Sequence, residues 1–198
     1  MTQDTQSSEY AQRLVRKQSA FWKQILDVQA PYRWNLNRLK PGRTLEIGCG
    51  IGRNLRQLGV GSIGVDHNDV AVQICRQRGY VAYTPEELAG LNLAGENLFD
   101  SLLFSHVLEH MTFTEASRCI ATYLTLLSPS GRILLITPQE AGFESDPTHV
   151  EFMTFEKLSL ILSEHCFLTS CAYSFPFPRW AGKLFRYNEF VVVGERMP

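Results

Sequence analysis

The sequence has no run of about 20 apolar residues, the length that a membrane-spanning helix needs. Its first ten residues, MTQDTQSSEY, lack the basic-then-apolar profile of a secretory signal. The 5 cysteines include no C-x-x-C pair and no zinc-type spacing, which favours free thiols in a reducing compartment. We therefore expect a cytoplasmic protein without a membrane segment.

Net charge is also low. A formal net charge of −1 gives no global field that would draw the chain to nucleic acid. The charge is uneven, because residues 1–44 hold eight Lys and Arg against three Asp and Glu. We interpret this basic segment as solvated helix faces, with a site for an anionic partner as the alternative.

Strand and helix patterns alternate along the 198 residues. Strand patterns cover 43–48, 61–68, 80–84, 99–107, 132–137, 167–174 and 188–194, and helix patterns cover 54–58, 69–79, 85–91, 114–127 and 154–165. Two further helices are predicted before the first strand, the second of them beginning at Pro31. Parallel strands need crossover helices, so the alternation predicts an α/β fold with a seven-stranded, mostly parallel sheet and helices on both faces.

The segment GCGIGRN follows the first strand, at the edge of such a sheet where ligands bind. Gly48 and Gly50 allow a tight bend and close approach of a ligand, and Gly52 removes a Cβ where the following helix packs. Asp66 ends the second strand, 20 residues after Glu46, the distance at which an exposed acid meets a ribose hydroxyl pair. This pattern indicates a nucleoside ligand.

Two common nucleotide sites are disfavoured. The third glycine of G-x-G-x-x-G, counted from Gly48, falls on Arg53, which would crowd the pyrophosphate of a nicotinamide dinucleotide. There is no G-K-[ST] for triphosphate hydrolysis. Glu46 places a carboxylate beneath the loop, which suits a cationic amino group better than a diphosphate.

The segments LEIGCGIGRNL, GVDHN, FDSLLFSHVLEHM and LLSPSGRILLITPQE, in this order, resemble the class I S-adenosylmethionine-dependent methyltransferases, especially bacterial small-molecule enzymes. The resemblance covers about residues 30–193. It implies a Rossmann-like fold with an antiparallel last strand, S-adenosylmethionine as cofactor, a helical lid at residues 1–40 and a methyltransferase domain at 41–198. It assigns cofactor binding to Glu46, Gly48, Cys49, Gly50, Gly52, Asp66, His67, Ser105 and His106.

The chain departs from this family after the third strand, where many relatives carry an Asp and this sequence reads YTPEEL. The resemblance therefore assigns no adenine contact to Thr84 or Glu86.

The polar segment 137–152 is long for a connection and follows the fifth strand, which favours a binding loop. We predict His149 as the general base, because a neutral imidazole accepts a proton at cytoplasmic pH and Asp146 would orient it. The alternative is that Asp146 caps a turn ahead of Pro147 and His149 only braces that turn.

The segment HVLEH at 106–110 matches the zinc signature H-x-x-E-H. That signature needs both histidines on one helical turn and a distant third ligand. Because His106 ends an apolar strand, we expect no metal and interpret Glu109 and His110 as structural residues, with contact to cofactor or substrate as the alternative.

The reaction that this resemblance implies is methyl transfer to an oxygen or nitrogen nucleophile of a small molecule. The aromatic loop at 175–187 either walls the acceptor pocket or covers the sheet edge, and Arg179, Lys183 and Arg186 would suit an anionic acceptor. Glycan or lipid-linked acceptors, and a module that binds S-adenosylmethionine without transferring methyl, stay open as alternatives. We expect a monomer or homodimer.

Overall fold

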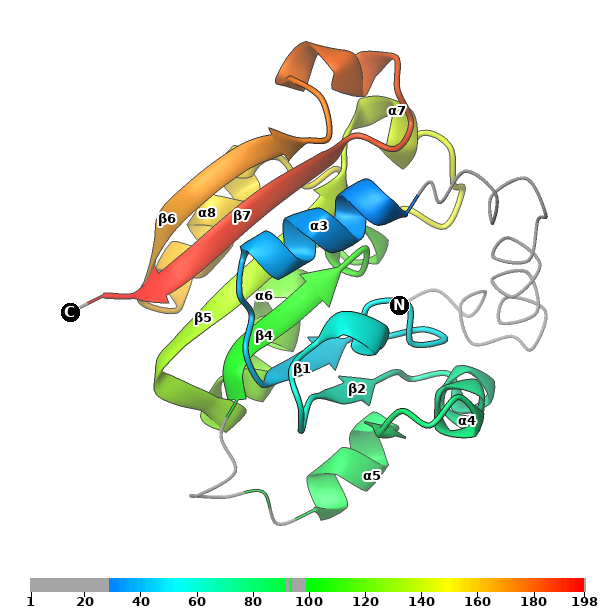
Figure 1. Ribbon diagram of the computed structural model, residues 1–198. Coiled ribbons are helices and arrows are strands. Elements are labelled where there is room, and N and C mark those ends of the chain that lie inside the picture. The colour runs from blue at the N-terminus through cyan, green and yellow to red at the C-terminus, as the bar shows by residue number, and fades with distance from the viewer. Residues whose placement is uncertain (1–28, 92, 94–98, 198) are drawn as a thin grey trace. The chain divides into compact units, whose positions relative to one another are not determined.

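The computed structural model describes residues 29–91, 93 and 99–197 (Figure 1). Of the predicted helical lid at residues 1–40, only the part from residue 29 falls within this range. It contains helix α3 (Ala30–Arg38), which has proline in its first turn, as the sequence predicts. The chain divides into two compact units, Thr2–Asn92 and Leu93–Pro198, which are described in turn.

The unit Thr2–Asn92 contains three short parallel strands. They are β1 (Thr44–Ile47), β2 (Ile63–Val65) and β3 (Ala82–Tyr83), and β2 pairs with both others. Helices α4 (Asp69–Gln77) and α5 (Pro85–Gly90) follow β2 and β3. The buried cluster that joins these elements contains Cys49, Leu55, Val72, Cys75 and Ala82.

The helix predicted at 54–58 is wrong. This segment forms only the 3-10 turn η2 (Leu55–Gln57), and Leu58 is already extended. Residues up to Asn54 belong to the turn after the glycine loop, and Gly59 follows at once. Too few residues remain to offset the cost of starting an α-helix.

The unit Leu93–Pro198 contains the longer strands β4 (Phe99–Ser105), β5 (Leu127–Pro138), β6 (Phe167–Phe175) and β7 (Glu189–Arg196). Helices α6 (Phe113–Tyr123), α7 (Glu140–Phe143) and α8 (Phe155–Glu164) lie between them, with 3-10 turns η3 (Leu108–His110), η4 (Leu124–Leu126) and η5 (Arg179–Lys183). Strand β4 pairs parallel with β5, whereas β7 is antiparallel to both β5 and β6.

The strand order β3-β2-β1-β4-β5-β7-β6 gives a seven-stranded sheet. The predicted α/β fold with an antiparallel last strand is therefore confirmed. One difference is that β5 begins at Leu127, five residues before the predicted start at Arg132. Leu127 pairs with Phe99 across a register shift and both side chains are buried, so the strand also takes in residues 127–131, of which Leu127 was predicted to be helical.

Side-chain caps mark the start of helices α4, α6 and α8. Asn68 accepts bonds from two backbone N–H groups of α4, and Thr154 caps α8. Thr112 and Glu115 form a reciprocal capping box at the start of α6. These caps fix the residues at which the three helices begin.

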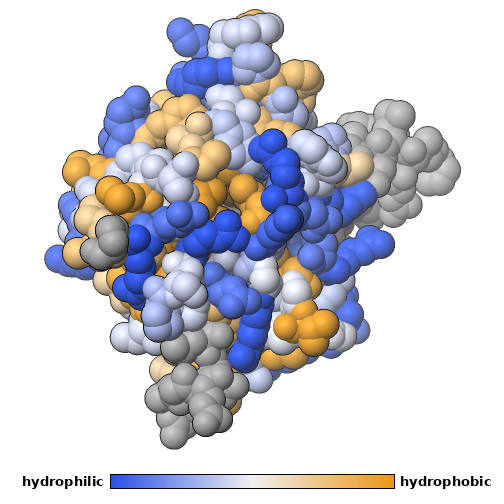
Figure 2. All heavy atoms as spheres, turned by 60° about the vertical axis from the view of Figure 1, so that its left-hand side comes forward, coloured by the Kyte–Doolittle hydropathy of each residue, from blue (hydrophilic) through white to orange (hydrophobic). Residues whose placement is uncertain are grey.

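Within the described residues, no helix has the length and apolar character needed to cross a bilayer. Several large apolar side chains are exposed, among them Val60, Trp180 and Leu184. Figure 2 shows hydrophobic residues dispersed between hydrophilic ones on the face that it presents. Scattered exposure of this kind is ordinary for a globular surface.

Candidate functional site

The glycine loop after β1 has a left-handed backbone at three positions. Gly48, Gly50 and Gly52 have φ angles of 70°, 53° and 78°, a region that favours glycine. The N–H groups of Gly48 and Cys49 both donate to the carbonyl of Val65, at 2.7 and 3.0 Å. The loop is therefore anchored to the end of the neighbouring strand β2.

Gly52 also lacks room for a side chain. A Cβ there would lie 2.7 Å from Cδ2 of Tyr80 and 3.1 Å from Sγ of Cys75. The close packing expected at Gly52 therefore occurs against these side chains from α4 and the residues just after it. Cys49, one of the predicted cofactor residues, contributes a neutral thiol here, since a hydrogen bond with Cys75 and burial raise its pKa.

Asp66 follows β2, where the sequence predicts the ribose acid, but it is not the exposed side chain that was expected. It is only 7% exposed, and its Oδ2 accepts the N–H of Gly50 at 2.7 Å. Its Oδ1 accepts the N–H of Asn68 at 2.9 Å and lies 3.7 Å from Nδ1 of the neighbouring His67. Asp66 therefore holds the glycine loop in place, while further lone pairs of its carboxylate remain able to accept hydroxyl groups.

Glu46, in β1 beneath the loop, is 2% exposed. Its Oε1 accepts a hydrogen bond from Nδ2 of Asn54 at 2.7 Å, whereas its Oε2 has no partner among the described residues. Burial raises the pKa of Glu46 to about 8, although the bond from Asn54 opposes this rise. Sequence reasoning missed Asn54, although its position eight residues after Glu46, at the end of the loop, was visible.

These residues fit a nucleoside that carries an ammonium group. A buried carboxylate oxygen without a partner is costly unless a donor or a cation pairs with it. The unpaired Oε2 of Glu46 supplies an acceptor for an ammonium, and Asp66 supplies acceptors for hydroxyl groups. Because Gly48, Gly50 and Gly52 have no side chains, a ligand can approach the backbone of this loop closely.

In the unit Leu93–Pro198, Ser105 and His106 end β4. His106 has a φ angle of 58°, unusual for a residue with a side chain. Its Nε2 lies 2.8 Å from Oε1 of Glu189, and its Nδ1 lies 3.3 Å from Oε1 of Glu109. The side chain of His106 is 42% exposed, so its partial burial opposes protonation only weakly, and the two carboxylates raise its pKa to about 10. Its assignment to the cofactor stays a prediction.

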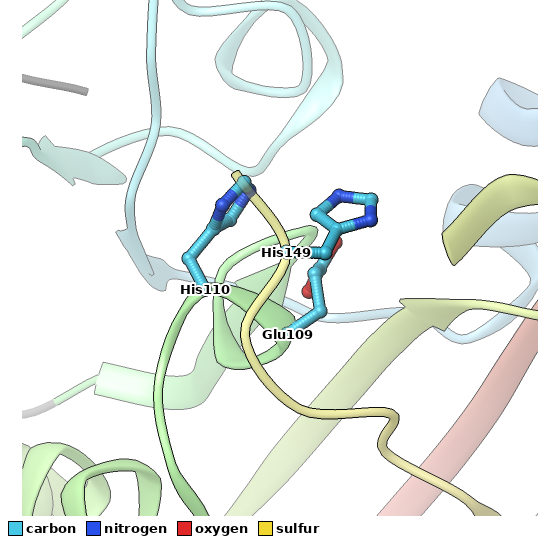
Figure 3. A group of neighbouring side chains, drawn as sticks. All are labelled: Glu109, His110 and His149. Carbon is cyan, nitrogen blue, oxygen red and sulfur yellow. The ribbon is translucent and has the colours of Figure 1, made fainter. Parts of the chain in front are cut away.

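Glu109 and His110, the last two residues of η3, lie close to His149 (Figure 3). One potential ligand atom from each of the three side chains lies within 4.8 Å of those of the others. The rings of His110 and His149 meet edge to face, with centroids 4.8 Å apart. Burial lowers the pKa of His110, so its ring is neutral at pH 7. The sequence placed His149 in a separate acceptor loop and did not predict this grouping.

Asp146, the predicted orienting partner of His149, bonds to the neighbouring residue Thr148. Its Oδ1 accepts the N–H of Thr148 at 3.1 Å and the hydroxyl of Thr148 at 2.8 Å. Nδ1 of His149 instead lies 2.7 Å from the carbonyl oxygen of Phe143. This geometry agrees with the alternative in which Asp146 caps the turn at Pro147, and the carbonyl of Phe143 orients the imidazole of His149.

The aromatic loop 175–187 is tied to the end of β5 by a buried amide pair. Nδ2 of Asn188 donates to Oε1 of Gln139 at 3.0 Å, and Oδ1 of Asn188 accepts the N–H of Phe177 at 2.9 Å. Arg179, one of the predicted anion-binding residues, pairs through two nitrogens with the carboxylate of Glu140. Its charge is therefore already compensated.

A comparison of the sequence with protein families identifies the fold's relatives. Residues 14–173 match the family described as "Methyltransferase domain". The chain belongs to this methyltransferase family. The methyltransferase predicted from the sequence is therefore confirmed. No curated protein matches the sequence.

Solved structures agree on the fold. A magnesium protoporphyrin IX methyltransferase from Synechocystis PCC 6803 with bound SAH superposes with a TM-score of 0.70 and 18% identity, over 98% of this methyltransferase and 97% of that chain. A SAM-dependent methyltransferase from Archaeoglobus fulgidus gives 0.66 and 20% over 83% and 93% of the two chains. The N-methyltransferase NodS from Bradyrhizobium japonicum WM9, in complex with SAH, gives 0.63 and 17% over 95% and 98%.

Proposed function

We propose that the protein transfers a methyl group from S-adenosylmethionine to an oxygen or nitrogen nucleophile of a small molecule. The observation that supports this most is Oε2 of Glu46, a buried carboxylate oxygen without a partner among the described residues, directly beneath a glycine loop. A cofactor with an ammonium group and a ribose satisfies both Glu46 and Asp66. Similar structures that were solved with SAH carry the same fold.

The chemistry rests on positioning. S-adenosylmethionine supplies a methyl group that its sulfonium already activates, so the protein's main task is to align donor and acceptor. The bond from Gly50 to Asp66 fixes the loop before the cofactor arrives, which lowers the ordering cost of binding. Glu46 is proposed to hold the amino group and Asp66 the ribose.

The proposed acceptor is a small molecule, because one similar structure is a magnesium protoporphyrin IX methyltransferase. Another is the N-methyltransferase NodS, which supports a nitrogen nucleophile. An anionic acceptor remains an option through Lys183 and Arg186, which are exposed, whereas Arg179 is paired with Glu140. Glycan and lipid-linked acceptors are the second candidates.

A panel assay tests the proposal. The full chain is incubated with S-adenosylmethionine and with separate panels of small hydroxy, amino and carboxylate compounds, glycans and lipid-linked intermediates, and S-adenosylhomocysteine is measured. Release that depends on a small molecule is the expected result, and Asp66→Ala should reduce it. Binding of S-adenosylmethionine without acceptor-dependent release in any panel would indicate a non-catalytic binding module.

The general base predicted at His149 stays a prediction. Its Nδ1 faces the carbonyl of Phe143, which leaves Nε2 as the nitrogen that can accept a proton or another ligand. A base is needed only where the acceptor nucleophile carries a proton.

A further inference from the structure

We propose that Glu109, His110 and His149 form a binding site for one divalent transition-metal ion of the Zn²⁺ type. The segment HVLEH predicted no metal, because His106 ends an apolar strand and does not share a helical turn with His110. The structure supplies a third ligand from residue 149, and His106 lies outside the set (Figure 3). The inference does not depend on the proposed methyl acceptor.

Both imidazoles are set up as ligands through Nε2. Nδ1 of His110 lies 3.1 Å from the carbonyl oxygen of Thr148, and Nδ1 of His149 lies 2.7 Å from that of Phe143. A carbonyl only accepts hydrogen bonds, so each Nδ1 carries the proton and each Nε2 keeps its lone pair. A backbone carbonyl that fixes the tautomer in this way is the usual outer partner of a metal-bound histidine.

The hydroxyl of Thr148 supports the same assignment for His110. It donates to Oδ1 of Asp146 at 2.8 Å and lies 3.2 Å from Nδ1 of His110. Since its proton is directed at the carboxylate, the hydroxyl accepts from the ring. Both neighbours of this nitrogen are therefore acceptors.

The burial of Glu109 supports a metal site independently of the two histidines. Its side chain is 0% exposed, and neither carboxylate oxygen accepts a hydrogen bond from the described residues. Its one charged contact is Nδ1 of His106, 3.3 Å from Oε1, which leaves Oε2 without any partner in the described part of the chain. His106 therefore pairs with one oxygen of Glu109, and the other is a buried acceptor that a bound metal ion would satisfy.

The backbone holds the three ligands near one another. The carbonyl oxygen of Glu109 accepts the N–H groups of Val150 at 2.7 Å and Glu151 at 3.2 Å. These bonds attach the segment after α7 to η3 immediately beyond His149. The ligand arrangement is therefore built into the fold rather than made by mobile surface side chains.

The ligand types select the class of ion. Two imidazoles and one carboxylate are the three protein ligands of many zinc sites that keep a fourth position open, whereas Mg²⁺ and Ca²⁺ prefer oxygen ligands. One candidate atom of each residue lies within 4.8 Å of those of the others, and zinc bonds of about 2.0–2.2 Å would require the three coordinating atoms to come to roughly 3.3 Å of one another. If the proposed function holds, the open position is where an acceptor oxygen or nitrogen would bind.

Direct metal titration tests the site. The full chain, freed of any affinity tag and treated with a chelator, is titrated with Zn²⁺ in competition with a chromophoric chelator, and with Co²⁺ by its visible absorption. We expect one equivalent of either ion and no effect of Mg²⁺. His149→Ala should weaken binding by at least about 100-fold, beyond the 10–100-fold that the loss of an outer partner costs.

Controls separate ligation from folding. His165→Ala removes a histidine that contacts Ser117 instead and should leave Zn²⁺ affinity unchanged. Glu109→Gln keeps the side-chain volume and should also weaken binding, while Zn²⁺ should raise the melting temperature of the wild type but not of either ligand variant. Equal Zn²⁺ affinity in wild type and His149→Ala, or no saturable binding by the wild type, would overturn the proposal. No S-adenosylmethionine is present, so these results stand apart from the methyl-transfer assay.

Discussion

The backbone N–H of Gly50 donates to Oδ2 of Asp66 over 2.7 Å, joining the loop after β1 to the residue after β2. The glycine loop and the acid at the end of β2, which the sequence assigned to the cofactor as separate features, are thus hydrogen-bonded to each other. Asp66 has a structural task as well as its proposed ribose contact, and a substitution there acts on both.

Asp66→Ala should lower both stability and cofactor affinity. The N–H of Gly50 would lose its partner, which costs about 1–3 kcal/mol of unfolding free energy when the group is buried. Loss of the ribose contacts should weaken S-adenosylmethionine binding about ten- to hundredfold. Urea unfolding and titration calorimetry measure the two effects. Asp69→Ala, at an exposed acid of α4, should change neither by much. Wild-type affinity in Asp66→Ala would remove Asp66 from the cofactor site.

Cofactor binding should release a proton near neutral pH. Burial raises the pKa of Glu46 to about 8, so the free protein carries this carboxyl mostly protonated at pH 7. An ammonium group beside Oε2 favours the ionised form. Calorimetry in buffers of different ionisation enthalpy should therefore show release approaching one proton at about pH 7 and none well above pH 9. Glu46→Gln should abolish the buffer dependence, and the same dependence in both proteins would contradict the assignment.

Glu46 should also make the free protein less stable as pH rises. Its pKa is about 8 in the folded state against 4.5 as the ordinary value, so the folded state binds the proton more tightly than the unfolded state. Its contribution is fully present below pH 4.5 and is lost as pH rises through 8. The unfolding free energy of the wild type should fall relative to Glu46→Gln across this window. Parallel pH profiles from urea unfolding would show that Glu46 does not titrate there.

Two glycines separate backbone strain from steric conflict. Gly52 and Gly79 have similar φ angles of 78° and 82°, but a Cβ at Gly79 meets nothing within 4 Å, whereas one at Gly52 lies 2.7 Å from Tyr80. Gly79→Ala should cost about 1–2 kcal/mol, the penalty for a left-handed alanine. Gly52→Ala should cost more, because Tyr80 must also move. Equal unfolding free energies of the two variants would mean that the loop absorbs the extra methyl group.

The sequence was sufficient for the fold because its signals are local. Periodicity located most strands and helices, Thr154 marked the start of α8, and the spacing of Glu46 from Asp66 placed two acids on adjacent strand ends. The failures came where a distant contact decided the outcome. The helix at 54–58 stopped after one turn, and β5 began early because Leu127 found a buried partner in Phe99.

The grouping of Glu109, His110 and His149 could not be predicted for the same reason. Nothing in the segment 137–152 indicates that its end bonds to the carbonyl of Glu109, about 40 residues earlier in the chain. The chemistry of the side chains was visible in the sequence, but their proximity depends on two backbone hydrogen bonds. A search for a third metal ligand by spacing alone therefore had no signal to find.

Those two bonds also divide the segment between β5 and α8 into parts that tolerate substitution to different degrees. The carbonyl of Glu109 accepts the main-chain N–H groups of Val150 and Glu151, so these two bonds do not require a particular side chain at either position. Glu144 and Ser145 are exposed and lie before the attachment point. Substitutions at Glu144 and Ser145 can therefore change the exposed surface of this segment. The position of His149 does not depend on those side chains.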